Sequence, residues 1–224
     1  MFDRVAPRYD LTNTVLSLGQ DRHWRRVAVH AADLRPGDLV ADVASGSGAL
    51  AEQLRRAGAR VVALDLSLEM LRTGARRESA HPSIGLGLLW ANADANRLPL
   101  PDAGVDALTI AFGLRNLPEP AAALREFARV VRPGGRLVVL EFATPGWAPF
   151  RLLYERYLTR ALPLAAHLVA SDPAAYRYLA DSIRAWPDQA GLARMIADAG
   201  WVQVQWKSLS GGIVAAHRAR RPGP

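Results

Sequence analysis

Short apolar runs alternate with amphipathic stretches over most of the middle of the chain. The apolar runs 38–43, 60–65 and 105–112 have the length of strands, and the last is apolar enough for a strand buried on both faces. Stretches with helical spacing, among them 49–57 and 121–131, separate these runs. Strand, helix and strand in this order predict βαβ units, and therefore a parallel sheet with helices on both faces.

Further strands are expected after this middle part and within it. The segment 87–90 is a third strand in chain order, and 136–142 is a fifth, which follows the turn Pro133-Gly134-Gly135 that closes the preceding helix. The last two strands, 201–207 and 213–217, are joined by a glycine-containing turn and read as a hairpin. The predicted fold class is therefore α/β, with a mostly parallel seven-stranded sheet and a C-terminal antiparallel hairpin.

Two segments lie outside the alternation. Residues 1–35 are polar and helical, and residues 147–186 are dense in leucine and aromatic side chains and follow the fifth strand. A chain of 224 residues suits one α/β domain with a sizeable core. We therefore expect a single domain, 1–224, with an N-terminal helical segment and a helical lid inserted at 147–186.

The composition limits which kinds of catalytic or metal site the chain can have and in which cellular compartment it is expected. The chain has no cysteine, which excludes disulfides, thiolate metal sites and a cysteine nucleophile. Its histidines and carboxylates show no metal-ligand spacing, so no metal is expected. The N-terminus lacks the layout of a signal peptide, and no apolar run approaches the about 20 residues of a membrane span. A cytoplasmic protein is the expectation.

The formal net charge of +7 comes almost entirely from arginines that are scattered along the chain. No block combines dense basic residues with the aromatic spacing of a nucleic-acid platform, so we expect no nucleic-acid partner. A solvated basic surface and attraction to an anionic membrane both remain open.

A glycine loop follows the first strand and opens the next helix. It reads Asp42-Val43-Ala44-Ser45-Gly46-Ser47-Gly48, in which Gly46 and Gly48 allow a ligand to approach the backbone closely. The spacing is DxxxGxG rather than the GxGxxG of dinucleotide sites. The loop favours a nucleoside-type cofactor without a pyrophosphate, and the alternative is a tight turn without any ligand.

Acidic residues follow the next two strands. Asp65 ends the second strand, 23 positions after Asp42, where a carboxylate can bind both hydroxyls of a ribose. Its alternative role is that of an acid at a helix N-terminus. Asp94-Ala95 follows the third strand, where an acid can meet an adenine amino group. Because the carboxyl ends of parallel strands share one edge, we expect these residues to meet there, together with Ala111 and Glu141.

Five distinctive motifs are spread over the chain. They are YDLTNTVLSLGQDRHW (9–24), AFGLRN (111–116), RVVRPGGRL followed by LEF (129–142), YRYLADSIR followed by WPDQ (176–189) and LSGGIVA (209–215). Together they resemble the ubiquinone/menaquinone C-methyltransferase family, in one register from about residue 2 to 218. The wording of 10–22 and 184–189 looks like the menaquinone branch of the family.

The resemblance implies a Rossmann-like class I fold and methyl transfer from S-adenosylmethionine to the ring of a prenylated demethylmenaquinol. It places Ser47, Asp65, Asp94 and Ala95 on the cofactor. The chain departs from the usual family pattern at four positions, which puts individual contacts to the methionine tail and the adenine in doubt. These are Ser45, Ser47, Ala49 and Ala111.

Carbon methylation needs an electron-rich ring, so a base that removes the phenolic proton, or a cation that stabilises the resulting phenolate, is useful. Arg115 is a candidate for stabilising the phenolate, with a surface or cofactor-carboxylate contact as its alternative. Tyr9 and Asp10 are candidates on a segment that could fold over the crevice, with capping of the first helix as their alternative. His217, in the last strand, is expected to be structural.

The segment between Trp147 and Leu168 carries Arg151, Arg156 and Arg160 among its apolar residues, a pattern that suits an interfacial lid as well as core helices. We expect peripheral contact with the inner face of the membrane, and leave a homodimer open. Competing functions are methylation of a ubiquinone precursor or another aromatic ring, a nicotinamide-dependent oxidoreductase, a non-catalytic subunit of a quinone-synthesis complex and an RNA methyltransferase.

Overall fold

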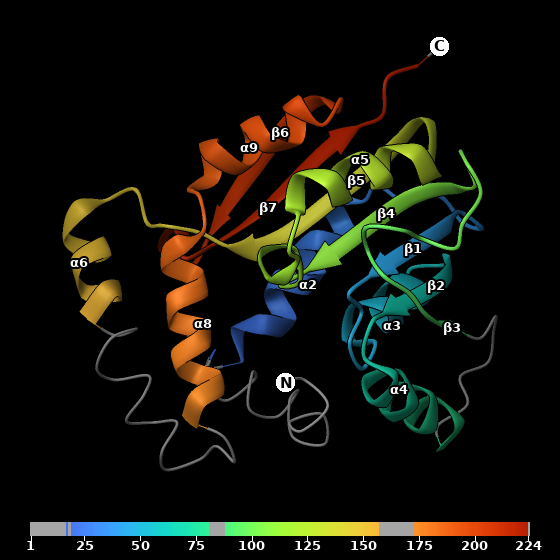
Figure 1. Cartoon of the computed structure of the whole chain (residues 1–224), viewed down its shortest axis with the longest axis horizontal. Helices are drawn as coiled ribbons and strands as arrows, with labels where there is room; N and C mark the ends of the chain where they lie inside the picture. Colours follow the sequence, from blue (N-terminus) through green and yellow to red (C-terminus); the bar gives the residue numbers. More distant parts are fainter. Residues whose placement is uncertain (1–16, 18, 81–87, 157–172, 224) are drawn as a thin grey trace.

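Seven strands form one mixed sheet at the centre of the computed structural model (Figure 1). The structure describes residues 17, 19–80, 88–156 and 173–223. The strands are β1 (Leu39–Val43), β2 (Arg60–Asp65), β3 (Leu89–Asn92), β4 (Val105–Ala111), β5 (Val131–Phe142), β6 (Val202–Leu209) and β7 (Val214–Arg220).

The order of the strands in the sheet is β3-β2-β1-β4-β5-β7-β6. Neighbours from β3 to β5 run parallel, and β7 runs antiparallel to both β5 and β6. The predicted mostly parallel sheet with a C-terminal antiparallel hairpin is therefore confirmed. The order reverses between β1 and β4, and open α/β sheets bind their ligands at the carboxyl ends of strands beside such a switch point.

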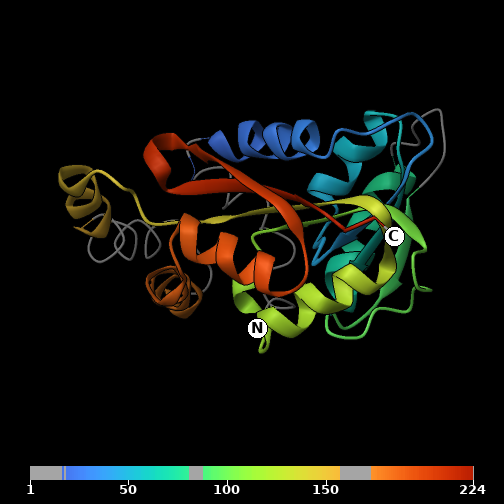
Figure 2. The same ribbon diagram turned by 90° about the horizontal axis from the view of Figure 1, so that it is seen from above.

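Helices cover both faces of the sheet. They are α2 (Gln20–Ala31), α3 (Ala49–Arg56), α4 (Leu68–Ala80), α5 (Pro120–Val130), α6 (Ala148–Arg156), α8 (Pro173–Ala185) and α9 (Gln189–Asp198), with short 3-10 turns η3 (Leu114–Asn116) and η5 (Ser210–Gly212). Figure 2 shows α2 on one side of the sheet, and α5 and α9 on the other.

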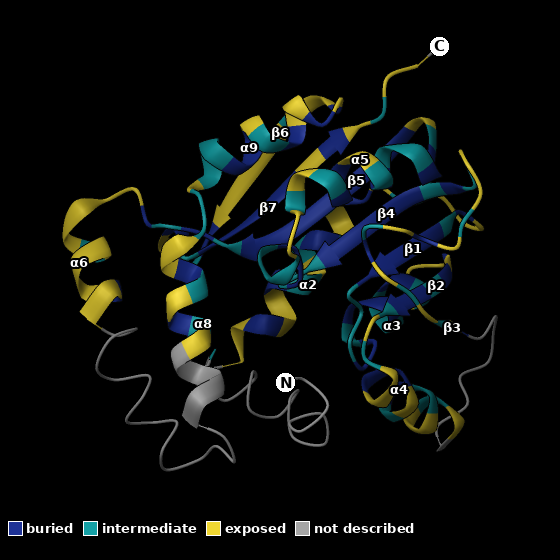
Figure 3. Ribbon diagram, viewed as in Figure 1, coloured by how far each residue is buried: buried dark blue, intermediate teal, exposed yellow. Residues whose placement is uncertain are grey.

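The sheet accordingly separates two apolar cores. Trp24 and Ala28 of α2 and Leu54 of α3 pack against one face, and Phe127 of α5 and Ile196 of α9 pack against the other. The central strands are buried along most of their length (Figure 3). Burial on both faces is the reason that these strands are apolar without a clear alternation.

One predicted boundary is wrong. Pro133-Gly134-Gly135 does not close the preceding helix, because α5 ends at Val130 and β5 begins at Val131. The three residues form an irregular part of β5, where Gly134 N and Gly135 O hydrogen-bond to the backbone of Arg221 at 3.0 Å each. Because Arg221 lies near the other end of the chain, the sequence around residue 133 gives no sign of this pairing. The third strand is shifted from the predicted 87–90 to Leu89–Asn92.

The predicted lid segment is helical where the structure describes it. Helix α6 projects away from the sheet, and α8 lies beside the carboxyl end of β5 (Figure 1). Tyr154 of α6 packs with Ala180 and Ile183 of α8 in a small apolar cluster that also contacts Phe142 at the end of β5. Residues 157–172 lie outside the described part of the chain.

Candidate functional site

The glycine loop connects β1 to α3 in a tight turn at the carboxyl edge of the sheet. Ser45 N donates to Leu64 O of β2 at 3.1 Å, and Gly48 N donates to Ser45 O at 2.9 Å. Gly46 and Gly48 have φ values of 58° and 81°, a region that residues with a side chain rarely adopt. The glycines at these two positions are therefore required by the shape of the loop.

Asp65, at the end of β2, is bound directly to this loop. Its Oδ2 accepts a hydrogen bond from Gly46 N at 2.8 Å, and its Oδ1 accepts one from Ser67 N at 2.7 Å. The sequence prediction that Asp65 meets the loop agrees with this geometry. Leu66, the next residue, is 75% exposed. An exposed leucine beside a strand-end carboxylate offers an apolar surface to a planar base, and no motif in the sequence points to this leucine.

Asp94 and Ala95 follow β3 on the same edge. Ala93 N donates to Asp65 O at 3.0 Å, which brings the start of this segment next to the end of β2. Asp94 Oδ1 accepts a hydrogen bond from Asn96 N at 2.9 Å, and Ala95 is buried. The structure thus brings Gly46, Asp65 and the Asp94-Ala95 pair into one region, as predicted.

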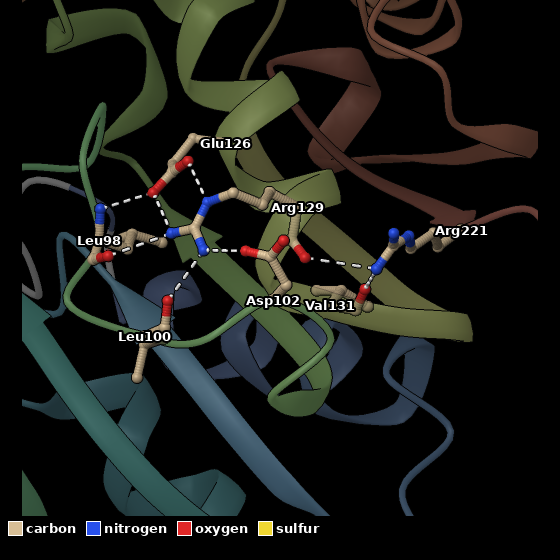
Figure 4. A network of polar contacts seen from close by, with 7 residues as sticks. All are labelled: Leu98, Leu100, Asp102, Glu126, Arg129, Val131 and Arg221. Atoms are coloured by element: carbon tan, nitrogen blue, oxygen red, sulfur yellow. Dashed lines mark hydrogen bonds and ion pairs between the residues drawn. The ribbon is translucent and has the colours of Figure 1, made fainter.

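A polar network holds the rest of this loop against α5 (Figure 4). Glu126 accepts a hydrogen bond from Leu98 N at 2.8 Å, and Arg129 donates to Leu98 O at 3.2 Å and to Leu100 O at 3.0 Å. Arg129 also pairs with Glu126 at 2.7 Å and with Asp102 at 2.6 Å. Its guanidinium holds the pKa of the Glu126 carboxyl below its ordinary value. The network stabilises the loop that carries Asp94.

Asp42 lies under the glycine loop and is 1% exposed. Its Oδ1 accepts a hydrogen bond from Thr109 Oγ1 at 2.6 Å. Among the described residues, Asp42 Oδ2 and the nearby Ser45 Oγ are buried without a hydrogen-bond partner. Burial raises the pKa of the Asp42 carboxyl to about 7, against a smaller opposing effect of Thr109. The sequence places Asp42 at the start of the motif and at the carboxyl edge of the sheet, whereas its burial and its unpartnered oxygen are seen only in the structure.

On the other side of the switch point, Arg115 forms part of the protein framework. Its Nη1 lies 2.8 Å from Glu141 Oε1 and 2.7 Å from Phe112 O, and its Nε donates to Ser182 Oγ of α8 at 3.3 Å. The Arg115 and Glu141 side chains are 5% and 0% exposed. These contacts of Nη1 and Nε fix the orientation of the guanidinium.

Aromatic side chains surround this arginine. Its guanidinium carbon lies 4.9 Å from the centre of the Phe142 ring, which is 5.0 Å from the centre of the Phe112 ring. Trp24 of α2 continues the row, 5.9 Å from Phe112. Phe112 has φ of 57° at the carboxyl end of β4, an unusual conformation for a large side chain. These rings offer flat apolar surfaces beside a cation, and only the fold brings them together.

The other sequence candidates are Tyr9, Asp10 and His217. Tyr9 and Asp10 lie outside the described residues. His217 lies in the interior of β7, where its Nε2 donates to Gln189 O at 2.8 Å and its ring stacks on Trp206. Burial lowers the pKa of His217 and so favours the uncharged form of the ring. The structure agrees with the expected structural role of this histidine.

Solved structures with a similar fold do not share one reaction. An S-adenosylmethionine-dependent methyltransferase from Aquifex aeolicus is 20% identical, with a TM-score of 0.60 over 84% of each chain. The [4+2]-cyclase SpnF is 18% identical, with a TM-score of 0.67 over 91% of this chain and 81% of that one. At this level of identity the likeness shows the fold alone.

The curated relatives are far more similar. A demethylmenaquinone methyltransferase from Mycolicibacterium paratuberculosis is 55% identical over 222 residues, which is 99% of this chain and 93% of the relative. One from Mycobacterium tuberculosis is 54% identical over 223 residues, or 100% of this chain and 92% of the relative. The model of the ubiE/COQ5 methyltransferase family matches residues 1–221. With this match over nearly its whole length, the chain belongs to the ubiE/COQ5 methyltransferase family.

Proposed function

We propose that the chain transfers the methyl group of S-adenosylmethionine to a ring carbon of a prenylated demethylmenaquinol. The names of relatives more than half identical over nearly the whole chain support this substrate. One observation supports the cofactor assignment: Gly46 N donates a hydrogen bond to Asp65 Oδ2 at 2.8 Å. This contact joins a carboxylate suited to bind a ribose to a glycine loop that lacks the GxGxxG motif for a pyrophosphate.

The residues at this edge fit the parts of the cofactor. Asp65 would accept hydrogen bonds from the ribose hydroxyls, exposed Leu66 would pack on the adenine and Asp94 would meet the adenine amino group. The unpartnered Asp42 Oδ2 and Ser45 Oγ would bind the ammonium group of the methionine tail. When bound, S-adenosylmethionine supplies a methyl group already activated on a sulfonium.

The protein's own contribution is to position the acceptor and to stabilise its oxyanion. Arg115 would do so through Nη2, because Glu141 and Phe112 O already hold Nη1 in place. A desolvated arginine stays charged, so it favours the phenolate that pushes electrons onto the neighbouring ring carbon. Tyr9 is proposed as the second catalytic group, and Ala111 can contribute only through its backbone.

Turnover assays with matched acceptors test this proposal. We expect methylation of a demethylmenaquinol and at least about tenfold slower methylation of a prenylated benzoquinol precursor of ubiquinone, since a fused two-ring acceptor offers more surface to the Phe112 and Phe142 rings than a single ring does. The reverse preference would assign the ubiquinone branch. Calorimetry with S-adenosylhomocysteine and NADH runs in parallel. Binding of NADH alone would favour an oxidoreductase, and cofactor binding without any turnover would favour a non-catalytic subunit.

The affinity for S-adenosylhomocysteine is expected to rise with pH, by close to tenfold per unit below pH 7, and to level off above it. The Asp42 carboxyl, whose pKa is about 7 in the protein without ligand, must lose its proton to pair with the ammonium group. Calorimetry in buffers of different ionisation enthalpy measures the affinity and the proton released. An affinity that does not change between pH 5.5 and 7 would contradict the assignment.

Asp42→Asn is the control, because the amide cannot titrate and should give a flat profile. The same carboxyl affects stability with the opposite sign. Its pKa is raised from 3.8 to about 7 on folding, so its contribution to stability is fully present below about pH 4 and is lost as the pH rises through 7. Thermal unfolding without ligand should show this loss in the wild type and not in Asp42→Asn.

Helix α6 is proposed as the part that contacts the membrane, where the acceptor's prenyl chain resides. Trp147 just before it is 70% exposed, and Leu152 and Leu153 within it are 52% and 63% exposed. Arg151 and Arg156 lie among these apolar residues, a composition suited to an anionic bilayer surface. No helix of the described residues has the length and apolar content needed to span a bilayer. The contact would therefore be peripheral.

Flotation with vesicles that contain phosphatidylglycerol checks this placement. The wild-type chain should float with the vesicles, and Trp147→Ser/Leu153→Ser should lower the partition coefficient at least about tenfold, since two large apolar side chains no longer insert. Trp206→Ser is the matched control, because Trp206 is also exposed but lies on β6. If the wild-type chain does not float with the vesicles, with or without anionic lipid, the proposed membrane contact of α6 is wrong.

A further inference from the structure

One face of α4 is directed at the glycine loop and at Trp90 of β3. Gly74, Arg77 and Glu78 occupy positions i, i+3 and i+4 of the helix and therefore share a face. Each of the three contacts either the loop or Trp90 of β3. None of them belongs to the motifs that define the cofactor site in the sequence.

Trp90 lies between the loop and the helix. A Cβ atom added to Gly48 would come within 2.4 Å of Trp90 Cη2, and one added to Gly74 would come within 2.3 Å of the same atom. The indole Nε1 donates to Glu78 Oε2 at 2.8 Å, while Glu78 Oε1 accepts from Leu88 N at 2.8 Å. The hydrogen bond to Glu78 thus holds the indole ring in place, and Gly48 and Gly74 leave room for the ring on either side.

The helix also contacts the loop backbone directly. A Cβ atom at Gly74 would lie 2.7 Å from Ser47 O, closer than real Cβ contacts allow. Arg77 Nη2 donates to that same carbonyl oxygen at 2.6 Å. Ser47 is 3% exposed, so its carbonyl has little access to water. Gly74 allows the carbonyl to approach the helix, and Arg77 satisfies it there.

The beginning of α4 is tied to the other end of the site. Asp65 Oδ1 accepts from Ser67 N at 2.7 Å, and Ser67 Oγ accepts from Met70 N at 3.2 Å as the helix starts. One helix therefore begins at the carboxylate proposed for the ribose and, two turns later, holds the loop proposed for the methionine tail. The spacing between these two parts of the site depends on it.

We infer that Gly74, Arg77 and Trp90 are positioning residues, through which α4 holds the glycine loop in the conformation that binds S-adenosylmethionine. The inference rests on the proposed function, because it concerns the same cofactor. The three residues act on the loop backbone and touch no reacting atom. Their loss should weaken cofactor binding and raise the KM for S-adenosylmethionine, with little change in kcat at saturating cofactor or in the KM for the quinol.

Gly74→Ala is the sharpest test, because alanine favours a helix over glycine and should not harm α4 itself. We expect its affinity for S-adenosylhomocysteine to fall at least about tenfold, since an overpacked contact displaces Ser47 and Trp90. Gly146→Ala is the matched control, because its Cβ would meet nothing within 4 Å. It should bind the ligand as the wild type does. Normal affinity of Gly74→Ala would overturn the inference.

Arg77→Gln provides a second test in case Gly74→Ala does not fold. It should lower the affinity about threefold to tenfold, the effect of losing one typical intramolecular hydrogen bond, and Arg77→Lys should restore part of it. Arg76→Gln removes the same charge from the same helix and is the control. Equal losses in the two glutamine variants, or a fall in kcat rather than a rise in KM, would overturn the inference.

The wild type separates this inference from the proposed function. If the wild type fails to bind S-adenosylhomocysteine, the proposed function itself is wrong. If it binds and methylates while Gly74→Ala and Arg77→Gln bind equally well, the proposed function holds and only the positioning role of α4 is wrong.

Discussion

Replacing Asp65 by alanine is expected to lower the affinity for S-adenosylhomocysteine about 100-fold, roughly the effect of losing two charge-assisted hydrogen bonds. We assign two roles to this carboxylate. It would bind the ribose, and it also holds Gly46 N at 2.8 Å and Ser67 N at 2.7 Å. Its removal therefore frees the glycine loop and the start of α4 together.

Isothermal calorimetry measures this loss, and Asp65→Asn separates the two tasks. The amide oxygen can still accept one backbone hydrogen bond, so the loop should stay close to its wild-type shape while the contact with the diol is weakened. Asp198→Ala is the control, because Asp198 is exposed at the end of α9, far along the chain from the loop. If Asp65→Ala bound the ligand with wild-type affinity, the ribose assignment would be refuted.

Arg115→Ala is expected to lower the free energy of unfolding by about 3–5 kcal/mol and to abolish turnover. Removal of the arginine leaves the Glu141 carboxylate, which is 0% exposed, without its partner at 2.8 Å. The variant also loses the contacts with Phe112 O and with Ser182 of α8. Denaturant unfolding of the protein without ligand measures the stability.

A double variant separates the stability effect from the catalytic one. In Arg115→Met/Glu141→Gln no buried charge is left unpaired, so most of the stability should return, while the introduced amide oxygen can still accept from Phe142 N. If Arg115 stabilises the acceptor's oxyanion, turnover should remain lost although S-adenosylhomocysteine binds normally. Recovery of turnover in the double variant would show that Arg115 only supports the framework. Arg115→Lys should keep partial stability, because one ammonium cannot replace three guanidinium contacts.

Much of the fold could be predicted from the sequence because its signals are local. The lengths of the apolar runs identified β1, β2 and β4 within one residue at each end, and their alternation with helices implied a parallel sheet. In such a sheet the carboxyl ends of the strands share an edge by geometry, so residues that follow strands must meet. This is why Gly46, Asp65 and Asp94 could be assigned to one site without any structure.

The tertiary structure decided what depends on contacts between distant segments. Asp42, whose pKa is raised by burial, accepts a hydrogen bond from Thr109, which is 67 residues away, and Arg115 and Glu141 are 26 residues apart. The irregular start of β5 depends on the backbone of Arg221, near the other end of the chain. The sequence by itself thus determined the order of the elements and which residues meet at the carboxyl ends of the strands. Only the tertiary packing decided which side chains are buried, which are ion-paired and which are fixed by hydrogen bonds. These properties depend on contacts with residues that are distant in the sequence.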